Sequence, residues 1–395
     1  MSAPPHRCWA VSAPGLEPVT VAELRTLGVT SLAPETGGVA FSATDDLLAA
    51  ANVQLRTASR IIVRAAEFQA KAFHELERLS RAVRWNQYVA PGRAVKLRVT
   101  CKKSRLYHSD AVAERVGAAI LRAVPGSRVV TGATDDDEEA VVEGRAERAP
   151  DDGALLIIVR LSHDVCTISV DSSGEPLHKR GYRLATAKAP IRETLAAGML
   201  LALEWDGSTP LLDPMCGAGT IAIEAAMLAR RIAPGVNRKF AFETWPSVPP
   251  KVGETARRAA RAAELPRAAV RILASDRDAG AIVAASANAA RAGVAADIEF
   301  RECALSAIEV PAAPGLLLTN PPYGDRIGDR TQVRNLYAQL GKVARVQGGG
   351  WALAFLSADH AFDMQLRLPL TEVSRFRNGG IPVRLLRAQV PLPKR

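Results

Sequence analysis

The sequence predicts an α/β protein whose C-terminal half is a doubly wound, mostly parallel sheet and whose N-terminal half consists of smaller α+β units. From Thr209 onward, apolar runs and helical patterns follow in the order strand, glycine loop, helix, strand, helix, strand. Three of those runs end at a polar residue, where open α/β sheets bind their ligands. Upstream, alternating apolar and basic residues over 95–101 indicate a strand with one solvated face.

The length of 395 residues is too great for one ordinary domain. We expect an N-terminal segment over 1–64, an α+β domain over 65–171, a linker and connecting helix over 172–205, and the doubly wound domain over 206–395. The connecting helix is expected to begin at Pro190, because proline is favoured in the first turn of a helix. The acidic stretch near 135–152 is expected to be a solvated loop and is given no function.

The composition excludes several classes of protein. No run of eighteen apolar residues predicts a membrane span, and the N-terminus lacks the apolar core of a secretory signal. The five cysteines are scattered and form no CxxC pair, which argues against a zinc ribbon or a disulfide framework. We therefore expect a cytoplasmic protein without a metal. The formal net charge of +10 is compatible with a polyanionic partner but identifies none by itself.

The first chemical motif is a short apolar strand that ends at Asp213 and is followed by the glycine loop Cys216-Gly217-Ala218-Gly219. Glycines there let the backbone approach a ligand closely. The chain lacks both GxGxxG and GxxxxGK[ST] at this place, so a nucleotide phosphate site is not indicated. An acid beside the loop suits a ligand with an ammonium group, which fits S-adenosylmethionine better than a pyrophosphate. A purely structural turn stays open as the alternative.

A second strand ends at Asp276, where an acid is placed to bind ribose hydroxyls. The spacing between Gly219 and this acid is much longer than the roughly 20 residues that separate the glycine loop from the acid in compact dinucleotide-binding domains. The extra length lies within 231–266, which we expect to be a lid or a side element. The predicted cofactor site comprises Asp213, Cys216, Gly217, Gly219, Thr220, Asp276, Arg277 and Asn320.

A third apolar strand, over 315–319, stops at Asn320-Pro321-Pro322-Tyr323. Because the residue before a proline is extended, Asn320 is presented at the carboxyl end of the strand. The side-chain oxygen of Asn320 and the carbonyl of Pro321 can accept hydrogen bonds from an amine on a planar base. Tyr323 can stack on that base, a contribution of about 1–3 kcal/mol. Asn320, Pro321, Pro322 and Tyr323 are the predicted catalytic group, which works by positioning, and a strand-end turn without chemistry is the alternative.

Two basic segments carry aromatic residues, one over 102–109 beside a helix start and one over 177–183. Cations and rings at a helix start suit contacts with phosphates and bases, although a solvated loop is the alternative. The predicted RNA contacts are Lys102, Lys103, Arg105, Tyr107, His108, Lys179 and Arg180.

The three strand-end motifs together resemble the class I S-adenosylmethionine-dependent methyltransferases that act on exocyclic amines. The stretch 104–109 with the following helix looks like the THUMP RNA-binding domain, and 1–64 resembles a ferredoxin-like segment. Similarity to the THUMP-linked guanine-N2 RNA methyltransferases extends over nearly the whole chain and includes 177–183, 233–243 and 320–324. The resemblance implies a Rossmann-like methyltransferase domain, S-adenosylmethionine as cofactor, and N2-methylguanosine in 23S ribosomal RNA or transfer RNA as product.

One position departs from that family, which usually has an acid after the third strand to accept from the adenine amino group. This chain has Ala304 there, so either Glu302 or a backbone carbonyl substitutes, or cofactor affinity is reduced. Cys216 and Cys303 are not expected to be nucleophiles, because the Pro-Cys pair of cytosine-C5 methyltransferases is missing. Two other functions stay open: an adenine-N6 or glutamine-N5 methyltransferase acting on DNA or protein, and a non-catalytic RNA-binding protein.

Overall fold

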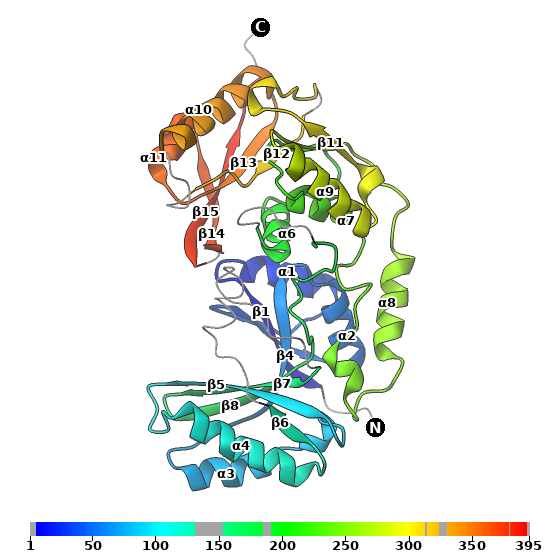
Figure 1. Ribbon diagram of the computed structural model, residues 1–395, viewed down its shortest axis with the longest axis vertical. Coiled ribbons are helices and arrows are strands. Elements are labelled where there is room, and N and C mark those ends of the chain that lie inside the picture. Colours follow the sequence, from blue (N-terminus) through cyan, green and yellow to red (C-terminus); the bar gives the residue numbers. More distant parts are fainter. Residues whose placement is uncertain are drawn as a thin grey trace. The chain divides into compact units, whose positions relative to one another are not determined.

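The computed structural model describes residues 5–130, 153–184, 191–312, 314–323, 330–378 and 380–392. The chain forms two compact units, each with its own sheet (Figure 1). The first unit comprises 1–12, 21–177 and 237–259, and the second comprises 13–20, 178–236 and 260–395. The acidic loop expected at 135–152 and the helix start expected at Pro190 lie outside the described residues.

The first unit is built on an eight-stranded sheet in the order β2-β3-β1-β4-β8-β7-β5-β6. Its strands are β1 (His6–Ser12), β2 (Leu32–Glu35), β3 (Gly38–Ala43), β4 (Ala58–Gln69), β5 (Ala94–Lys102), β6 (Arg128–Val130), β7 (Leu155–Ser162) and β8 (Val165–Asp171). The long strand β4 pairs with β1 along its first half and with β8 along its second. The expected domains 1–64 and 65–171 therefore share one continuous sheet.

Helices cover one face of the part of this sheet that is formed by β5, β7 and β8. The helices within the first unit are α2 (Asp45–Gln54), α3 (Phe73–Arg81) and α4 (Ser109–Ala123), while α1 (Glu17–Thr26) and α8 (Val252–Ala262) run across the unit boundaries. In Figure 1, β5, β7 and β8 lie over α3 and α4. Val95 and Leu97 of β5 are buried, whereas Lys96 and Arg98, which alternate with them, are half-buried. The strand predicted over 95–101 is therefore confirmed, and its basic residues lie on the less buried face.

A segment of the C-terminal half, 237–259, packs as a side element of the first unit. The guanidinium of Arg238 donates to the carbonyl oxygens of Glu175 at 2.6 Å and Pro176 at 2.9 Å. Trp245 is buried edge-on against Tyr88, with ring centroids 5.1 Å apart. Of the two roles expected for the long insertion, the structure shows the side element.

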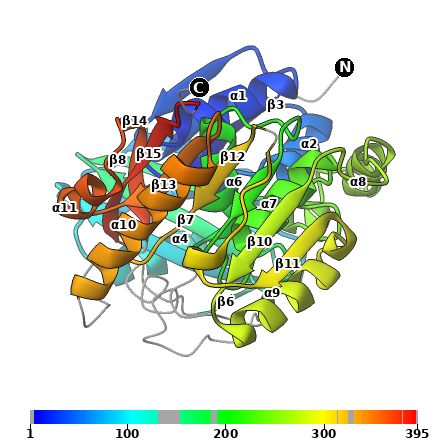
Figure 2. The same cartoon turned by 90° about the horizontal axis from the view of Figure 1, so that it is seen from above.

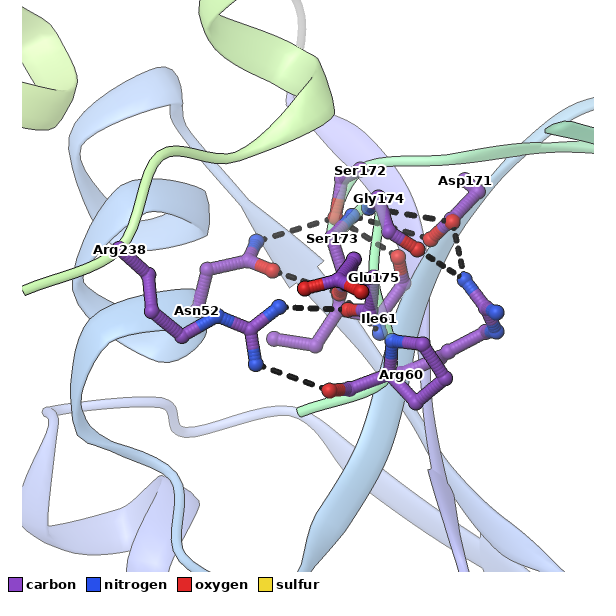
Figure 3. A network of polar contacts seen from close by, with 10 residues as sticks. Asn52, Arg60, Ile61, Asp171, Ser172, Ser173, Gly174, Glu175 and Arg238 are labelled. Carbon is purple, nitrogen blue, oxygen red and sulfur yellow. Dashed lines mark hydrogen bonds and ion pairs between the residues drawn. The ribbon is translucent and has the colours of Figure 1, made fainter. Parts of the chain in front are cut away.

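The turn at the end of β8 is tied down by a buried polar network (Figure 3). Asp171 forms an ion pair with Arg60 and accepts from the backbone N of Ser173 at 3.0 Å. The Asn52 amide of α2 donates to the hydroxyl of Ser172 at 3.0 Å and accepts from that of Ser173 at 2.7 Å. The residues expected to begin a linker at 172 are therefore an integral part of the first unit.

The second unit contains a seven-stranded sheet in the order β11-β10-β9-β12-β13-β15-β14. Its strands are β9 (Leu211–Asp213), β10 (Ile272–Asp276), β11 (Ile298–Glu302), β12 (Leu316–Thr319), β13 (Ala352–Ser357), β14 (Thr371–Asn378) and β15 (Ile381–Gln389). The five neighbouring strands β11, β10, β9, β12 and β13 are parallel to one another. The β14–β15 hairpin is added at β13, where β15 pairs antiparallel with β13. The order reverses between β9 and β12, which is where doubly wound sheets bind ligands. The predicted fold class is confirmed.

Helices pack against this sheet and hold the ends of its strands in position. They are α6 (Glu193–Ala202), α7 (Thr220–Ala229), α9 (Ala279–Arg291), α10 (Arg330–Gln347) and α11 (His360–Asp363). In Figure 2, α10 runs along β13 and α9 runs along β11. Val333, Tyr337 and Leu340 of α10 pack in one core with Leu212 of β9 and Leu317 of β12. This core fixes the ends of β9 and β12 relative to each other.

Candidate functional site

Asp213 ends β9, and its side chain is almost completely buried, with only 1% of the residue exposed. Its Oδ1 accepts hydrogen bonds from Oγ1 of Thr319 at 2.9 Å and from the backbone N of Met215 at 3.2 Å. Burial raises the pKa of Asp213 to about 7, with a smaller contribution from the charge of Asp276, while the two hydrogen bonds oppose the rise. The site thus holds a buried carboxyl group that ionises near neutral pH and favours a cationic ligand group.

The glycine loop after Asp213 adopts the left-handed conformations that glycine tolerates, with φ of +52° at Gly217 and +83° at Gly219. A Cβ on Gly217 would meet nothing within 4 Å, whereas a Cβ on Gly219 would lie 2.9 Å from that of Ala285 in α9. Gly219 therefore permits the close approach of the loop to α9. Gly217 leaves open space beside the backbone, as a ligand cradle requires.

Asp276 ends β10 and is joined to the same loop. Its Oδ2 accepts from the backbone N of Gly217 at 2.9 Å, and its Oδ1 accepts from the backbone N of Asp278 at 3.1 Å. The next residue, Arg277, is exposed. The structure thus brings together both predicted cofactor acids and the glycine loop at the carboxyl ends of adjacent strands.

Asn320 follows β12 on the other side of the point where the strand order reverses. Its Oδ1 is buried and has no hydrogen-bond partner among the described residues. The preceding residue, Thr319, is the one that donates to Asp213, so Asn320 lies next to the cofactor acids. An unpaired buried oxygen costs about 1–3 kcal/mol, which a ligand that donates a hydrogen bond would offset.

The aromatic member of the motif is held by a residue from another element. The hydroxyl oxygen of Tyr323 accepts from Nδ2 of Asn378, the last residue of β14, at 2.6 Å. Pro321 is buried, whereas Pro322 and Tyr323 are half-buried. The ring of Tyr323 is thereby fixed at its hydroxyl end while part of it stays accessible.

Two further predicted cofactor residues lie at the loop but are buried: Thr220 at the start of α7 and Cys216. Burial raises the pKa of the Cys216 thiol, and the charges of Asp213 and Asp276 add to the shift. A protonated thiol is a poor nucleophile, which agrees with the expectation that Cys216 is not catalytic.

The side of the site next to β11 lacks a carboxylate at Ala304, as the sequence indicates. Glu302 ends β11 and lines a cavity of about 460 Å³ together with Ser275 and Cys303. The hydroxyl of Ser275 is buried without a hydrogen-bond partner in the described part of the chain. Glu302 is one of three acids that line this cavity, with Glu299 and Glu309, and it is the one nearest to Ala304 in the chain.

The loop from Lys102 to His108 lies in the first unit, between β5 and α4. All five residues predicted there as RNA contacts are exposed, and Tyr107 most clearly, at 68%. The rings of Tyr107 and His108 lie 4.0 Å apart between centroids. The backbone N of Arg105 donates to Oδ1 of Asp164 at 2.7 Å, which ties the loop to the β7–β8 turn. The loop presents cations and an aromatic surface on a fixed backbone.

In the second basic segment, Arg180 is buried, contrary to the prediction that it contacts RNA. The side chain of Arg180 is only 2% exposed, and its Nε lies 3.5 Å from Oε1 of the fully buried Glu224. Tyr182 donates a hydrogen bond to the same carboxylate oxygen at 3.0 Å. Arg180 is therefore part of a buried charge cluster within the second unit and cannot be an RNA contact as predicted. Lys179, beside it, is half-buried.

Three polar residues of the site were missed by the sequence analysis: Thr319, Asn378 and Asn288. The amide of Asn288 in α9 donates to the carbonyl of Ala218 at 3.0 Å and so supports the glycine loop from behind. Asn288 is fully buried within an alanine-rich helix, and an amide side chain in this largely apolar pattern was the available signal. Thr319 and Asn378 gave no comparable signal.

The described residues contain no group of three or more His, Cys, Asp or Glu side chains that could hold a metal ion. Within the same part of the chain, no helix is both long and apolar enough to cross a membrane.

Two family models match the chain. The model described as "RMKL-like, methyltransferase domain" matches residues 180–387, and the model of the RlmL ferredoxin-like domain matches residues 7–62. A protein of Synechocystis sp. named "Putative RNA methyltransferase slr0064" is 31% identical over 97% of this chain and 96% of its own length. The "Ribosomal RNA large subunit methyltransferase K/L" of Syntrophotalea carbinolica is 31% identical over 97% of this chain, which spans only 53% of that larger protein.

Solved structures agree with this similarity over the whole chain. SMU.472, described as a "putative methyltransferase complexed with SAH", has a TM-score of 0.83 at 28% identity and covers 99% of this chain and 100% of its own. A protein of Listeria monocytogenes described as a "predicted N6-adenine-specific DNA methylase" has a TM-score of 0.82 at 31% identity, over 98% of this chain and 97% of its own.

Proposed function

Because this chain belongs to the family of RMKL-like methyltransferases, we propose that it methylates the exocyclic N2 amine of a guanosine in structured RNA. The family makes it a methyltransferase that uses S-adenosylmethionine. The proposed acceptor is 23S ribosomal RNA or transfer RNA in the cytoplasm. The observation that carries the amine chemistry is the buried, unpartnered Oδ1 of Asn320 beside the acids of the glycine loop.

The residues present at the ends of β9 and β10 fit the cofactor. We assign the buried carboxylate of Asp213 to its ammonium group, the open backbone at Gly217 to its close approach, and Asp276 to its ribose hydroxyls. Glu302 takes the adenine amino group in place of an acid at Ala304. When bound, the cofactor supplies an electrophilic methyl group.

The acceptor amine is held by the Asn-Pro-Pro-Tyr motif. Oδ1 of Asn320 and the carbonyl oxygen of Pro321 accept from the two N–H groups, and the ring of Tyr323 stacks on the base. This grip directs the nitrogen lone pair, otherwise delocalised into the ring, toward the methyl carbon. The nitrogen would form its new bond to the methyl carbon with that pair while the carbon–sulfur bond of the bound cofactor breaks and sulfur keeps the bonding electrons. The proton that the nitrogen then carries would leave to solvent. Positioning supplies the rate, so no strongly basic side chain is needed.

RNA as the acceptor is supported by the first unit and by the names of the relatives. We propose that 65–171 is a THUMP-like RNA-binding domain and that its exposed loop from Lys102 to His108 contacts phosphates and bases. Lys179 stays in the proposed RNA surface, whereas the buried Arg180 is removed from it.

Adenine is the second candidate acceptor, because the similar protein of Listeria monocytogenes is described as an adenine-N6 DNA methylase. The same motif can grip either amine, since both are NH₂ groups on planar bases. A glutamine-N5 acceptor or a non-catalytic RNA-binding role has no observation of its own in the structure.

Transfer of a labelled methyl group to RNA and DNA, followed by nucleoside analysis, tests the proposal. We expect the label in RNA as N2-methylguanosine with the wild-type protein and background label with Asn320→Ala. Label on adenine in DNA would replace the proposal with the second candidate. RNA from a strain that lacks the gene should lose one N2-methylguanosine, and reintroducing the wild-type gene, but not the variant, should restore it.

A further inference from the structure

The β14–β15 hairpin extends past the carboxyl ends of the parallel strands in the second unit. The pairing of β13 with β15 ends at Ser357 opposite Arg384, so the first three residues of β15 continue beyond the end of β13. The last residues of β14 accompany them, up to the pair Asn378 and Ile381. The hairpin tip therefore projects at the edge of the sheet where the candidate site lies.

Asn378 uses this position to reach the acceptor motif. Strands β12 and β14 are separated by β13 and β15, which puts them roughly 14 Å apart at the usual spacing between strands. Even so, Nδ2 of Asn378 lies 2.6 Å from the hydroxyl oxygen of Tyr323. The contact is possible because both residues lie at or beyond the strand ends. The overhanging tip thus adds a side chain to a site built otherwise from the parallel strands.

We infer that Asn378 is a positioning residue for the acceptor, which sets the plane of the Tyr323 ring on which the target base stacks. This inference rests on the proposed function. The backbone fixes one end of the tyrosine side chain, and the hydrogen bond from Asn378 fixes the other. The tilt of the base decides how the amine faces the methyl carbon. Loss of the Asn378 hydrogen bond should therefore lower the rate of methyl transfer more than the affinity for RNA.

The test is to measure kcat, KM for RNA and cofactor affinity for Asn378→Ala, Tyr323→Phe and the double variant. We expect each single variant to lower kcat about 5- to 10-fold, the effect of one lost hydrogen bond, and to leave KM and cofactor affinity within about twofold. Because both single variants remove the same bond, the double variant should be no slower than Tyr323→Phe. Asn378→Asp should recover part of the rate, since the phenol can donate to a carboxylate.

Gln389→Ala is the matched control, because this amide at the opposite end of the same hairpin donates to the carbonyls of Gly350 at 3.0 Å and Trp351 at 3.3 Å. It should leave kcat unchanged. If the Asn378→Ala protein does not fold, Tyr323→Phe still removes the same hydrogen bond without any change in the hairpin. An active wild type with unchanged kcat in the single variants, or additive losses in the double variant, would overturn this inference alone. A wild type that transfers no methyl group to RNA would overturn it together with the proposed function.

Discussion

Oγ1 of Thr319 donates a hydrogen bond to Oδ1 of Asp213 at 2.9 Å, so the last residue of β12 directly contacts the last residue of β9. The bond joins the two strands between which the sheet order reverses, and both residues are buried. It links the proposed cofactor acid to the residue that precedes Asn320.

Removing this hydroxyl should weaken cofactor binding. Thr319→Val keeps the shape but deletes a bond that stabilises the charged form of Asp213, and its pKa should rise further. We expect S-adenosylhomocysteine to bind about 5- to 10-fold more weakly at pH 7, measured by calorimetry. Thr319→Ser retains the hydroxyl and should bind like the wild type. Equal affinity in Thr319→Val would show that the bond has no part in the cofactor site.

Cofactor affinity should fall with decreasing pH near neutrality. Burial raises the pKa of Asp213 to about 7, so the carboxyl group is mostly ionised at pH 8 and mostly protonated at pH 6. Only the ionised form attracts an ammonium group, and the Kd of S-adenosylhomocysteine should therefore increase about tenfold from pH 8 to pH 6. Asp213→Asn should bind weakly and without this pH dependence. A wild-type Kd that is constant across the range would contradict the role of Asp213.

Replacing Asn320 should separate methyl transfer from cofactor binding. In Asn320→Ala the acceptor oxygen for the amine is lost, while the acids of β9 and β10 are unchanged. We expect transfer to RNA to fall by about 100-fold or more, because orientation carries the rate, and cofactor affinity to stay within about threefold. Asn320→Asp keeps acceptor oxygens and should retain more activity than the alanine variant. Unchanged turnover in Asn320→Ala would refute the assigned role.

The sequence predicts the parts of the site that are defined by local patterns. Asp213, the glycine loop, Asp276 and Asn320 each lie at the end of an apolar run, and parallel strands bring such ends to one edge. The doubly wound sheet followed from the same alternation of strands and helices.

The remainder depends on contacts between residues far apart in the chain. Asn378 and Tyr323 are 55 residues apart, and Arg180 looked like a surface cation because nothing in the sequence links it to Glu224. The side element at 237–259 belongs to the first unit through packing such as that of Trp245 on Tyr88. Such tertiary pairs leave no periodic pattern, so one sequence does not reveal them.

Lys102 and Lys103 should contribute to RNA affinity through charge. Both side chains are exposed at the end of β5, and replacing them with alanine would remove two of the proposed phosphate contacts. We expect weaker binding and a slope of log K against log salt that is shallower by about 1.5. Arg122→Ala is the control, because Arg122 is equally exposed but lies on α4, which covers the opposite face of the sheet. Equal losses in the control would mean that charge alone, without a defined surface, explains the binding.

Arg180→Ala should affect stability instead of RNA binding. The substitution leaves the carboxylate of Glu224 buried without its cation, and breaking such a pair costs about 3–5 kcal/mol of the free energy of unfolding. We expect this loss in urea denaturation, with RNA affinity of the folded protein unchanged.

Lys179→Ala, at the half-buried neighbouring position, should cost about 0.5 kcal/mol or less. Replacing both partners, in Arg180→Met with Glu224→Leu, should recover most of the stability, because no charge is then buried unpaired. If Arg180→Ala instead kept its stability and lost RNA affinity, Arg180 would be the RNA contact that its basic neighbourhood first indicated.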